Sequence, residues 1–294
     1  MTPERSAPPR IDPGVYTDDY YRTSCHGHED FAESGGQRVG ARFRKALALA
    51  GDLRGARVLD AGCGRAELVV QSARRGADAR GIDYAQAAVD IASHAIEDAG
   101  LAGRARVERG DLMALEFDDA SFDVAFLLDV VEHLYPDELS RALGELRRVL
   151  RPGGRLVVHT SPNTLLQDVV YPHYTRRVNA IALKLSEIVG FRDRLFTEFM
   201  LPSKREFPRG KYEREVHINE QSAPKLRAQL EGHGFRVERI EFWEPPMDSY
   251  FDAWQVNTDL LKVLDLVRFL RPFSFYPPLN RFFCNHIWMT AERA

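Results

Sequence analysis

Residues 58–67 read Val-Leu-Asp-Ala-Gly-Cys-Gly-Arg-Ala-Glu, and this stretch decides how the chain folds. Its apolar start predicts a buried strand, which ends at a turn containing Gly62 and Gly64. Glycines suit this turn because a Cβ would hinder a tight backbone turn and the close approach of a ligand. A helix expected from about residue 66 presents unpaired backbone N–H groups at its N-terminus. The stretch therefore predicts a strand, a turn and a helix beside a ligand site.

A second strand is expected over residues 79–83, and it ends in an acidic residue. Asp83 lies about 20 residues beyond the two glycines, where a carboxylate can accept hydrogen bonds from a ribose. Two other carboxylates argue against a dinucleotide. Glu67 stands where dinucleotide-binding turns have a third glycine, and Asp60 comes just before the turn. Both would repel a pyrophosphate. A ligand with a ribose and a positively charged, amino-acid-like part fits these residues better.

Five segments resemble the motifs of the class I S-adenosylmethionine (SAM)-dependent methyltransferases, in the style of the ubiquinone-type small-molecule O-methyltransferases. They follow one another at normal spacing and are residues 58–64, 81–84 (Gly-Ile-Asp-Tyr), 110–112 (Gly-Asp-Leu), 122–134 and 150–156. The resemblance implies SAM as the cofactor. It also implies an α/β fold with a Rossmann-like seven-stranded sheet, which is parallel except for its antiparallel last strand. Helices cover both faces of this sheet, and lid insertions are added to the core.

The chain divides into core segments and insertions on this basis. We expect a lead-in that covers the cofactor or substrate over 1–36, a SAM-binding core over 37–160, a core helix and strand over 222–242, and a final core strand over 285–294. The stretches 161–221 and 243–284 are long and rich in aromatic residues. Long loops inside a compact domain are commonly lids or binding loops, so we predict two lids over the ligand-binding edge of the sheet.

The resemblance also implies cofactor contacts at the carboxyl ends of the first four strands. These are Arg42, Asp60, Gly62, Gly64, Asp83, Tyr84, Asp111, Leu112, Leu128 and Asp129. Asp83 would hold the ribose hydroxyls, and Arg42 would pair with the methionine carboxylate. Tyr21 is a second candidate for the methionine end. The alternative for Arg42 and Tyr21 is an ordinary surface or packing role.

Methyl transfer to a hydroxyl also needs a proton acceptor, and two histidines are candidates. His133 follows the predicted fourth strand, and an unperturbed imidazole pKa near neutrality suits proton removal. His217 ends the first insertion and could reach the acceptor. The alternative is that Glu132 and His133 only shape their loop. The spacing of Asp129, Glu132 and His133 could also suit a divalent metal, but metal-free relatives carry Glu-His here, and we expect no metal.

The composition limits the kinds of partner and cellular location that we expect for the chain. A net charge of −3 and a pI near 6.3 give no basic footprint for nucleic acid. Three cysteines without metal-ligand spacing favour a reducing cytoplasm, and no run is long enough to span a membrane. Residues 260–271 are apolar nearly all round, which suits a lid helix or contact with a lipid-linked acceptor. The sequence leaves open whether the chain forms a homodimer.

We expect the acceptor to be the hydroxyl of a small organic or sugar-containing metabolite. Aromatic lids favour a ring-shaped or glycosylated molecule. The alternatives are N-methylation of a small-molecule amine, RNA methylation, which the charge balance disfavours, and a non-catalytic SAM-binding protein. By analogy alone, the composition suggests a bacterial chain that acts in secondary metabolism or glycan decoration.

Overall fold

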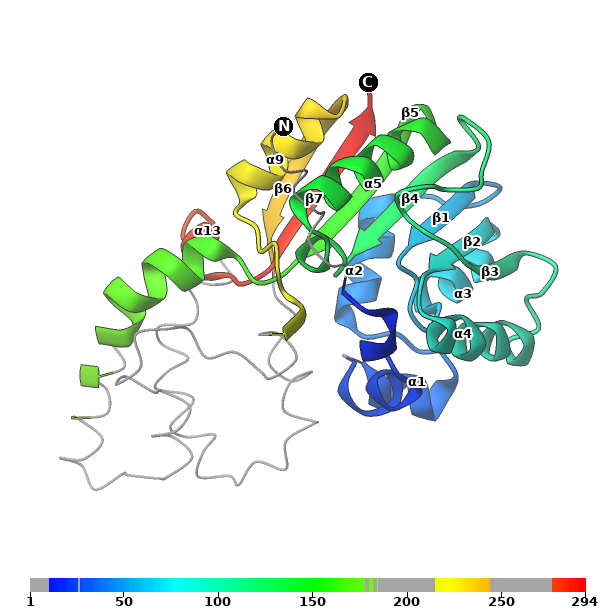
Figure 1. The fold of residues 1–294 in the computed structure, drawn as a ribbon, viewed down its shortest axis with the longest axis horizontal. Helices are drawn as coiled ribbons and strands as arrows, with labels where there is room; N and C mark the ends of the chain where they lie inside the picture. The colour runs from blue at the N-terminus through cyan, green and yellow to red at the C-terminus, as the bar shows by residue number, and fades with distance from the viewer. Residues whose placement is uncertain (1–10, 26, 178–179, 182–183, 185–214, 244–276) are drawn as a thin grey trace, which may run out of the picture.

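The computed structural model describes residues 11–25, 27–177, 180–181, 184, 215–243 and 277–294 (Figure 1). At its centre is a seven-stranded sheet with the strand order β3-β2-β1-β4-β5-β7-β6. The strands are β1 (Arg57–Ala61), β2 (Asp78–Asp83), β3 (Ala105–Arg109), β4 (Phe122–Leu128), β5 (Leu150–Thr160), β6 (Phe235–Phe242) and β7 (Ile287–Arg293). Strands β1 to β5 pair in parallel, whereas β7 runs antiparallel to both of its neighbours. The fold class predicted from the sequence is confirmed.

Helices cover both faces of the sheet. Helices α2 (Ala41–Ala50), α3 (Glu67–Arg74) and α4 (Gln86–Asp98) pack on one face, and α5 (Pro136–Val149) and α9 (Ala223–Gly232) pack on the other. Within β1, Val58 belongs to the first core and the next residue, Leu59, to the second. Alternate side chains are buried on opposite faces, which explains why the central strands are continuous apolar runs.

The sequence placed the elements around the glycine turn to within a few residues. The strand expected from residue 58 is β1, the helix expected from about residue 66 is α3, and the strand expected over residues 79–83 is β2. Helix α2 begins at Ala41 because the residue before it, Gly40, has an extended backbone with a ψ of 171°. Strand β5 begins at Leu150, where the chain pairs with β4 before an irregularity in register.

Short elements surround the carboxyl edge of the sheet. The N-terminal segment forms η1 (Pro13–Val15), η2 (Tyr20–Ser24) and α1 (His28–Ser34), none of which the sequence predicted. The remaining short elements are η3 (Val131–His133), η4 (Leu165–Thr175) and α13 (Asn280–Phe283). In Figure 1 the arrowhead of β4 points toward the dark-blue N-terminal segment. This segment packs through Tyr16 and Tyr21 against the start of α4.

The two predicted lids are described only in part, over 161–177, 180–181, 184 and 215–221 of the first and over 243 and 277–284 of the second. Residues 260–271 lie outside the described residues. Among the helices that are described, none has the length and apolar character needed to cross a membrane. The division of the chain into core and lids stays a prediction.

Candidate active site

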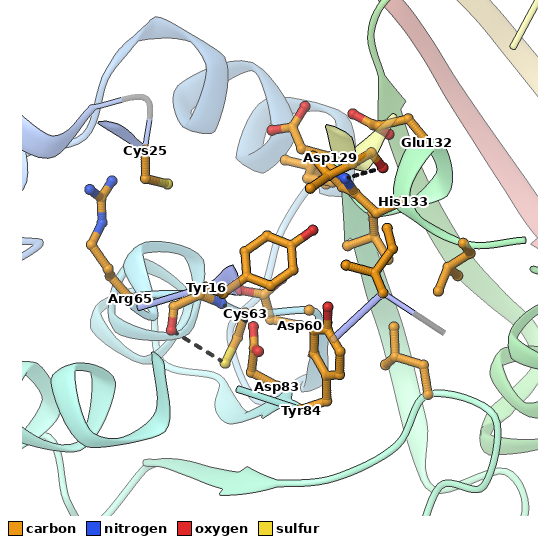
Figure 2. A pocket seen from close by; sticks show the side chains of 18 of the residues that line it. Tyr16, Cys25, Asp60, Cys63, Arg65, Asp83, Tyr84, Asp129, Glu132 and His133 are labelled. Carbon is orange, nitrogen blue, oxygen red and sulfur yellow. Dashed lines mark hydrogen bonds between the residues drawn. The ribbon is translucent and has the colours of Figure 1, made fainter. Parts of the chain in front are cut away.

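A cavity of about 550 Å³ opens at the carboxyl ends of β1, β2 and β4, under the N-terminal segment. It brings together all of the residues that the sequence proposed as contacts or proton acceptors. These are Arg42, Asp60, Gly62, Gly64, Asp83, Tyr84, Asp111, Leu112, Leu128, Asp129, His133 and His217. In the view of Figure 2, Asp60, Asp83 and Tyr84 gather at one end and Asp129, Glu132 and His133 at the other, with the ring of Tyr16 between them.

The glycine turn shapes the first end of the cavity. Gly62 has a φ of 82°, and a Cβ at this position would lie 2.4 Å from Cγ2 of Val130. The backbone N–H of Gly64 donates to Oδ2 of Asp83 at 3.0 Å, and the N–H of Ala85 donates to Oδ1 at 2.9 Å. Burial raises the pKa of Asp83, while these N–H groups oppose the rise. The turn therefore fixes the Asp83 carboxyl group against the cavity.

A buried ion pair joins this turn to the N-terminal segment. Arg65 and Glu67 are 2% and 5% exposed, and Nη2 of Arg65 lies 2.6 Å from Oε1 of Glu67. Nη1 of Arg65 donates to the carbonyl of Tyr21 at 2.7 Å, and its guanidinium lies 5.0 Å from the ring centroid of Phe31. The interpretation of Glu67 as an unbalanced charge that repels a pyrophosphate is therefore wrong, because Arg65 neutralises it.

Asp60 remains as the other carboxyl group at the turn. It is 4% exposed, and burial raises its pKa well above the usual range, with Glu67 and Asp83 adding to the effect. A cation bound beside Asp60 would favour its charged form.

Asp129 anchors the middle of the site. It has a φ of 54°, unusual for a non-glycine residue, and its N–H donates to the carbonyl of His159 at 3.0 Å. Its carboxylate lies 2.6 Å from Nη1 of Arg42 and 2.6 Å from Nδ1 of His159. Burial alone would raise the pKa of Asp129, but Arg42 and His159 outweigh burial and hold it below its usual range. Arg42 thus already contacts a carboxylate, and its pairing with the methionine end stays a prediction.

The second partner of Asp129 is His159 on β5. His159 is fully buried, and burial lowers its pKa against the opposing effect of Asp129. Nδ1 of His159 lies 2.6 Å from Oδ1 of Asp129, and its Nε2 shares a hydrogen bond with Nδ1 of His286 at 2.9 Å. The sequence gives no local signal that His159 and His286 position Asp129. His159 lies on β5 and His286 comes just before β7, so the two residues are far apart in the chain.

Glu132, His133 and His217 form a cluster at the other end of the cavity. The ring centroids of His133 and His217 are 4.9 Å apart, although 84 positions separate the two residues along the sequence. Nδ1 of His133 donates to the carbonyl of Val216 at 3.1 Å. Oε2 of Glu132 accepts from the hydroxyl of Thr160 at 2.8 Å.

Burial changes the acid–base character of this cluster. It lowers the pKa of His133 to about 4, with His217 adding to the shift. Burial and then the nearby Asp129 raise the pKa of Glu132 to about 7, while His217 opposes the rise. In this site His133 is therefore a weaker base than the unperturbed imidazole considered from the sequence. Glu132, which the sequence suggested only as a loop residue or a metal ligand, is the member whose pKa lies near neutrality.

Aromatic side chains from the N-terminal segment line the cavity between its two ends. The ring of Tyr16 lies 5.8 Å from that of Tyr84 and 6.1 Å from that of His133, both edge to face. Tyr20 lies 5.3 Å from Tyr16 and also lines the cavity. Sequence reasoning missed Tyr16 and Tyr20, although the run of tyrosines in an acidic segment was a visible signal.

Comparisons with known proteins agree with this geometry. Residues 59–158 match the family described as a methyltransferase domain. A ubiquinone biosynthesis O-methyltransferase of Alkalilimnicola ehrlichii is 36% identical over 128 residues, which are 42% of this chain and 50% of that protein. A sterol 4-C-methyltransferase of Caenorhabditis elegans is 29% identical over 101 residues, which are 34% of this chain and 30% of that protein. The chain spans half or less of the length of these two relatives.

The solved structures extend the likeness beyond the matched segment. An S-adenosylmethionine-dependent methyltransferase from Mesorhizobium loti superposes with a TM-score of 0.55 at 17% identity, covering 86% of this chain and 98% of that one. At this identity the likeness shows the fold alone, and it agrees with the strand order of the sheet.

Proposed function

We propose that this chain is a class I SAM-dependent methyltransferase that uses SAM to methylate a hydroxyl of a small organic or sugar-containing metabolite. The match of residues 59–158 to the methyltransferase domain family and the O-methyltransferases among the relatives support the proposal. The observation that carries the proposal is the Glu132, His133 and His217 cluster. All three residues line the same cavity as the glycine turn, and Glu132 and His133 lie at the end away from Asp83 (Figure 2). Groups that can accept a proton thus stand beside the cofactor-binding residues.

The residues at the first end of the cavity fit SAM. A Cβ at position 62 would lie 2.4 Å from Cγ2 of Val130, which favours glycine in this turn, and Gly62 lines the cavity. Asp60, Asp83 and Asp129 supply carboxyl groups for a ligand that carries both hydroxyls and positive charge. We propose that Asp83 accepts hydrogen bonds from the ribose and that Tyr84, Asp111 and Leu112 contact the adenine. Gly62, Gly64, Leu128 and Asp129 would then receive the methionine part, with Arg42 near its carboxylate.

When bound, SAM supplies an activated methyl group on its sulfonium. The chain's own residues must hold the acceptor in line with that group and take up the proton of its hydroxyl. Because Nδ1 of His133 donates to Val216, Nε2 carries the lone pair of the neutral ring, and we propose it as the proton acceptor. Its low pKa makes it a weak base alone, and the carboxyl group of Glu132 and the ring of His217 would share the proton.

The aromatic lining supports a ring-shaped or glycosylated acceptor. Tyr16, Tyr20 and Tyr84 contribute flat apolar faces with polar edges to the cavity, and such surfaces pack on aromatic rings and on sugars. Secondary metabolism or glycan decoration in a bacterial cytoplasm would be natural settings for this reaction. Both settings, and a possible pairing of two copies of the chain, are part of the proposal.

Two other functions compete with O-methylation. For N-methylation of an amine, proton removal is less demanding, so His133→Ala should cost little activity. For a protein that binds SAM without catalysis, no labelled product should form at all. One of the relatives is a sterol 4-C-methyltransferase, so carbon is a third possible acceptor atom. The mass of the product does not distinguish methylation at carbon from methylation at oxygen.

Calorimetric titration with SAM tests the cofactor assignment. We expect Asp83→Ala to weaken SAM binding by about ten- to a hundredfold, the effect of losing hydrogen bonds to a charged group. Asp78→Ala, at the opposite end of the same strand, is the matched control. Absence of SAM binding by the wild-type chain would overturn the proposal. Incubating cell extracts with methyl-labelled SAM, then identifying the product by mass spectrometry and NMR, assigns the acceptor and the methylated atom.

A further inference from the structure

Glu132, His133 and His217 have the arrangement of a metal-ligand set. One oxygen or nitrogen from each residue lies within 4.8 Å of the other two. The ligands come from two segments, the loop after β4 and the stretch that enters α9. Glu132 is buried and the two histidines are half-buried. Two imidazole nitrogens and one carboxylate oxygen form the donor set of many mononuclear transition-metal sites. Asp129, which the sequence spacing grouped with Glu132 and His133, instead contacts Arg42 and His159.

We propose that these three residues bind one divalent first-row transition-metal ion at the acceptor end of the cavity. The proposal replaces the expectation of a metal-free site. Two imidazoles favour ions of the Mn²⁺ to Zn²⁺ series over Mg²⁺ and Ca²⁺, which prefer all-oxygen ligands.

Neighbouring polar groups fix the orientation of these three side chains, as is usual for metal ligands. The Nδ1–H of His133 is held by the carbonyl of Val216 at 3.1 Å, which directs Nε2 to the cluster. Nδ1 of His217 lies 3.8 Å from Oε1 of Glu220, and Oε2 of Glu132 accepts from Thr160 at 2.8 Å. Metal-bound histidines characteristically donate their other N–H to a carbonyl or a carboxylate, as His133 does and as the position of Glu220 allows for His217.

The backbone also locks the two ligand segments together. The carbonyl of Glu132 accepts from the N–H of Ile218 at 2.9 Å and from the N–H of Asn219 at 3.1 Å. Glu132 is 1% exposed, and the side chain of His217 is 11% exposed. A fixed, nearly dry set of ligands requires little reorganisation to bind an ion. Because all three residues line the cavity, the remaining coordination positions face the space for the acceptor.

The consequence for catalysis rests on the proposed function. A divalent ion here would lower the pKa of an acceptor hydroxyl that reaches it. The hydroxyl proton then passes to water, and the oxygen lone pair forms the bond to the methyl carbon. The carbon–sulfur bond breaks, and its electron pair goes to sulfur. In this arrangement His133 is a metal ligand, and water takes its place as the proton acceptor.

Metal binding can be measured without knowing the acceptor. The full chain is stripped with a chelator, equilibrated with Zn²⁺, Mn²⁺ or Co²⁺, and analysed for bound metal by mass spectrometry. Co²⁺ also reports its ligands through visible absorption. We expect about one ion per chain, and binding at least about tenfold weaker in His217→Ala and in the near-isosteric Glu132→Gln. His94→Ala, which changes an exposed histidine on α4, should bind as the wild type does.

SAM titration of the same samples separates the two proposals. Retained SAM binding in Glu132→Gln and His217→Ala would show that these variants are folded. A wild-type chain that binds SAM but holds no metal more tightly than Glu132→Gln overturns the metal site and leaves the proposed function standing. Stoichiometric metal binding without SAM binding supports the metal site and overturns the proposed function.

Discussion

Replacing Gly62 by alanine should destabilise the fold through two separable effects. The first is backbone strain, since alanine would have to adopt a φ of 82° at a cost of about 1–3 kcal/mol. The second is steric, because the new Cβ would lie 2.4 Å from Cγ2 of Val130. A branched side chain cannot swing away as a long flexible one can, so the crowding should cost about 1–3 kcal/mol more.

Gly100→Ala isolates the first effect. Gly100 has a φ of 67°, and nothing lies within 4 Å of the position its Cβ would take. Unfolding in urea, followed by circular dichroism, gives the free energy of unfolding of each variant. We expect Gly62→Ala to be less stable than Gly100→Ala by about 1–3 kcal/mol, which is the steric part.

Val130→Ala provides the complementary test. It removes Cγ2 and should recover most of the steric part when combined with Gly62→Ala, giving a favourable coupling energy in a double-mutant cycle. Equal stabilities of Gly62→Ala and Gly100→Ala, or simple additivity with Val130→Ala, would refute the close contact between the glycine turn and the loop after β4.

Three further predictions concern charges. Arg65→Met should lower the free energy of unfolding by about 3–5 kcal/mol, measured in urea, because it leaves Glu67 charged and buried; adding Glu67→Gln should restore much of the loss. Asp123 accepts from the N–H of Arg57 and from Nε of Arg151, and although burial acts to raise its pKa, these partners hold it below the usual value. Its stabilising contribution is therefore present above the unfolded carboxyl pKa of about 4 and is lost as the pH falls through the folded pKa, so Asp123→Asn should flatten the acid side of the stability–pH curve. Under the O-methylation proposal, His133→Ala should lower the rate of methyl transfer by at least about a hundredfold while leaving SAM affinity unchanged, as measured with the identified acceptor and by calorimetry.

The core of the fold could be predicted from the sequence because its signals are local. Apolar runs, the Gly-x-Gly turn and the glycines that end helices each lie within a few residues of one another, and they predicted β1, α3, β2 and α4 closely. Parallel strands bring their carboxyl ends to one edge, so residues such as Asp60, Asp83 and Asp129 could be expected to converge without knowledge of the packing.

The acceptor end could be predicted only in part, because it depends on contacts between distant segments. His133 and His217 were each plausible alone, but their 4.9 Å ring separation rests on the hydrogen bonds from Ile218 and Asn219 to Glu132. The low pKa of His133 results from burial, which no local pattern reveals. The ion pair of Arg65 with Glu67 was equally hidden, since pairing depends on how the N-terminal segment covers the turn.

The loop after β4 connects the two ends of the cavity. Asp129 turns the chain sharply in the left-handed region, with its carboxylate held by Arg42 and His159. The next residue, Val130, packs against Gly62, and Glu132 and His133 follow within one short helical turn. The loop therefore carries groups that line both ends of the cavity on one short segment that touches the glycine turn. A change at Gly62 should for this reason disturb the Glu132, His133 and His217 cluster as well as the cofactor pocket, whereas the same change at Gly100 should leave both intact.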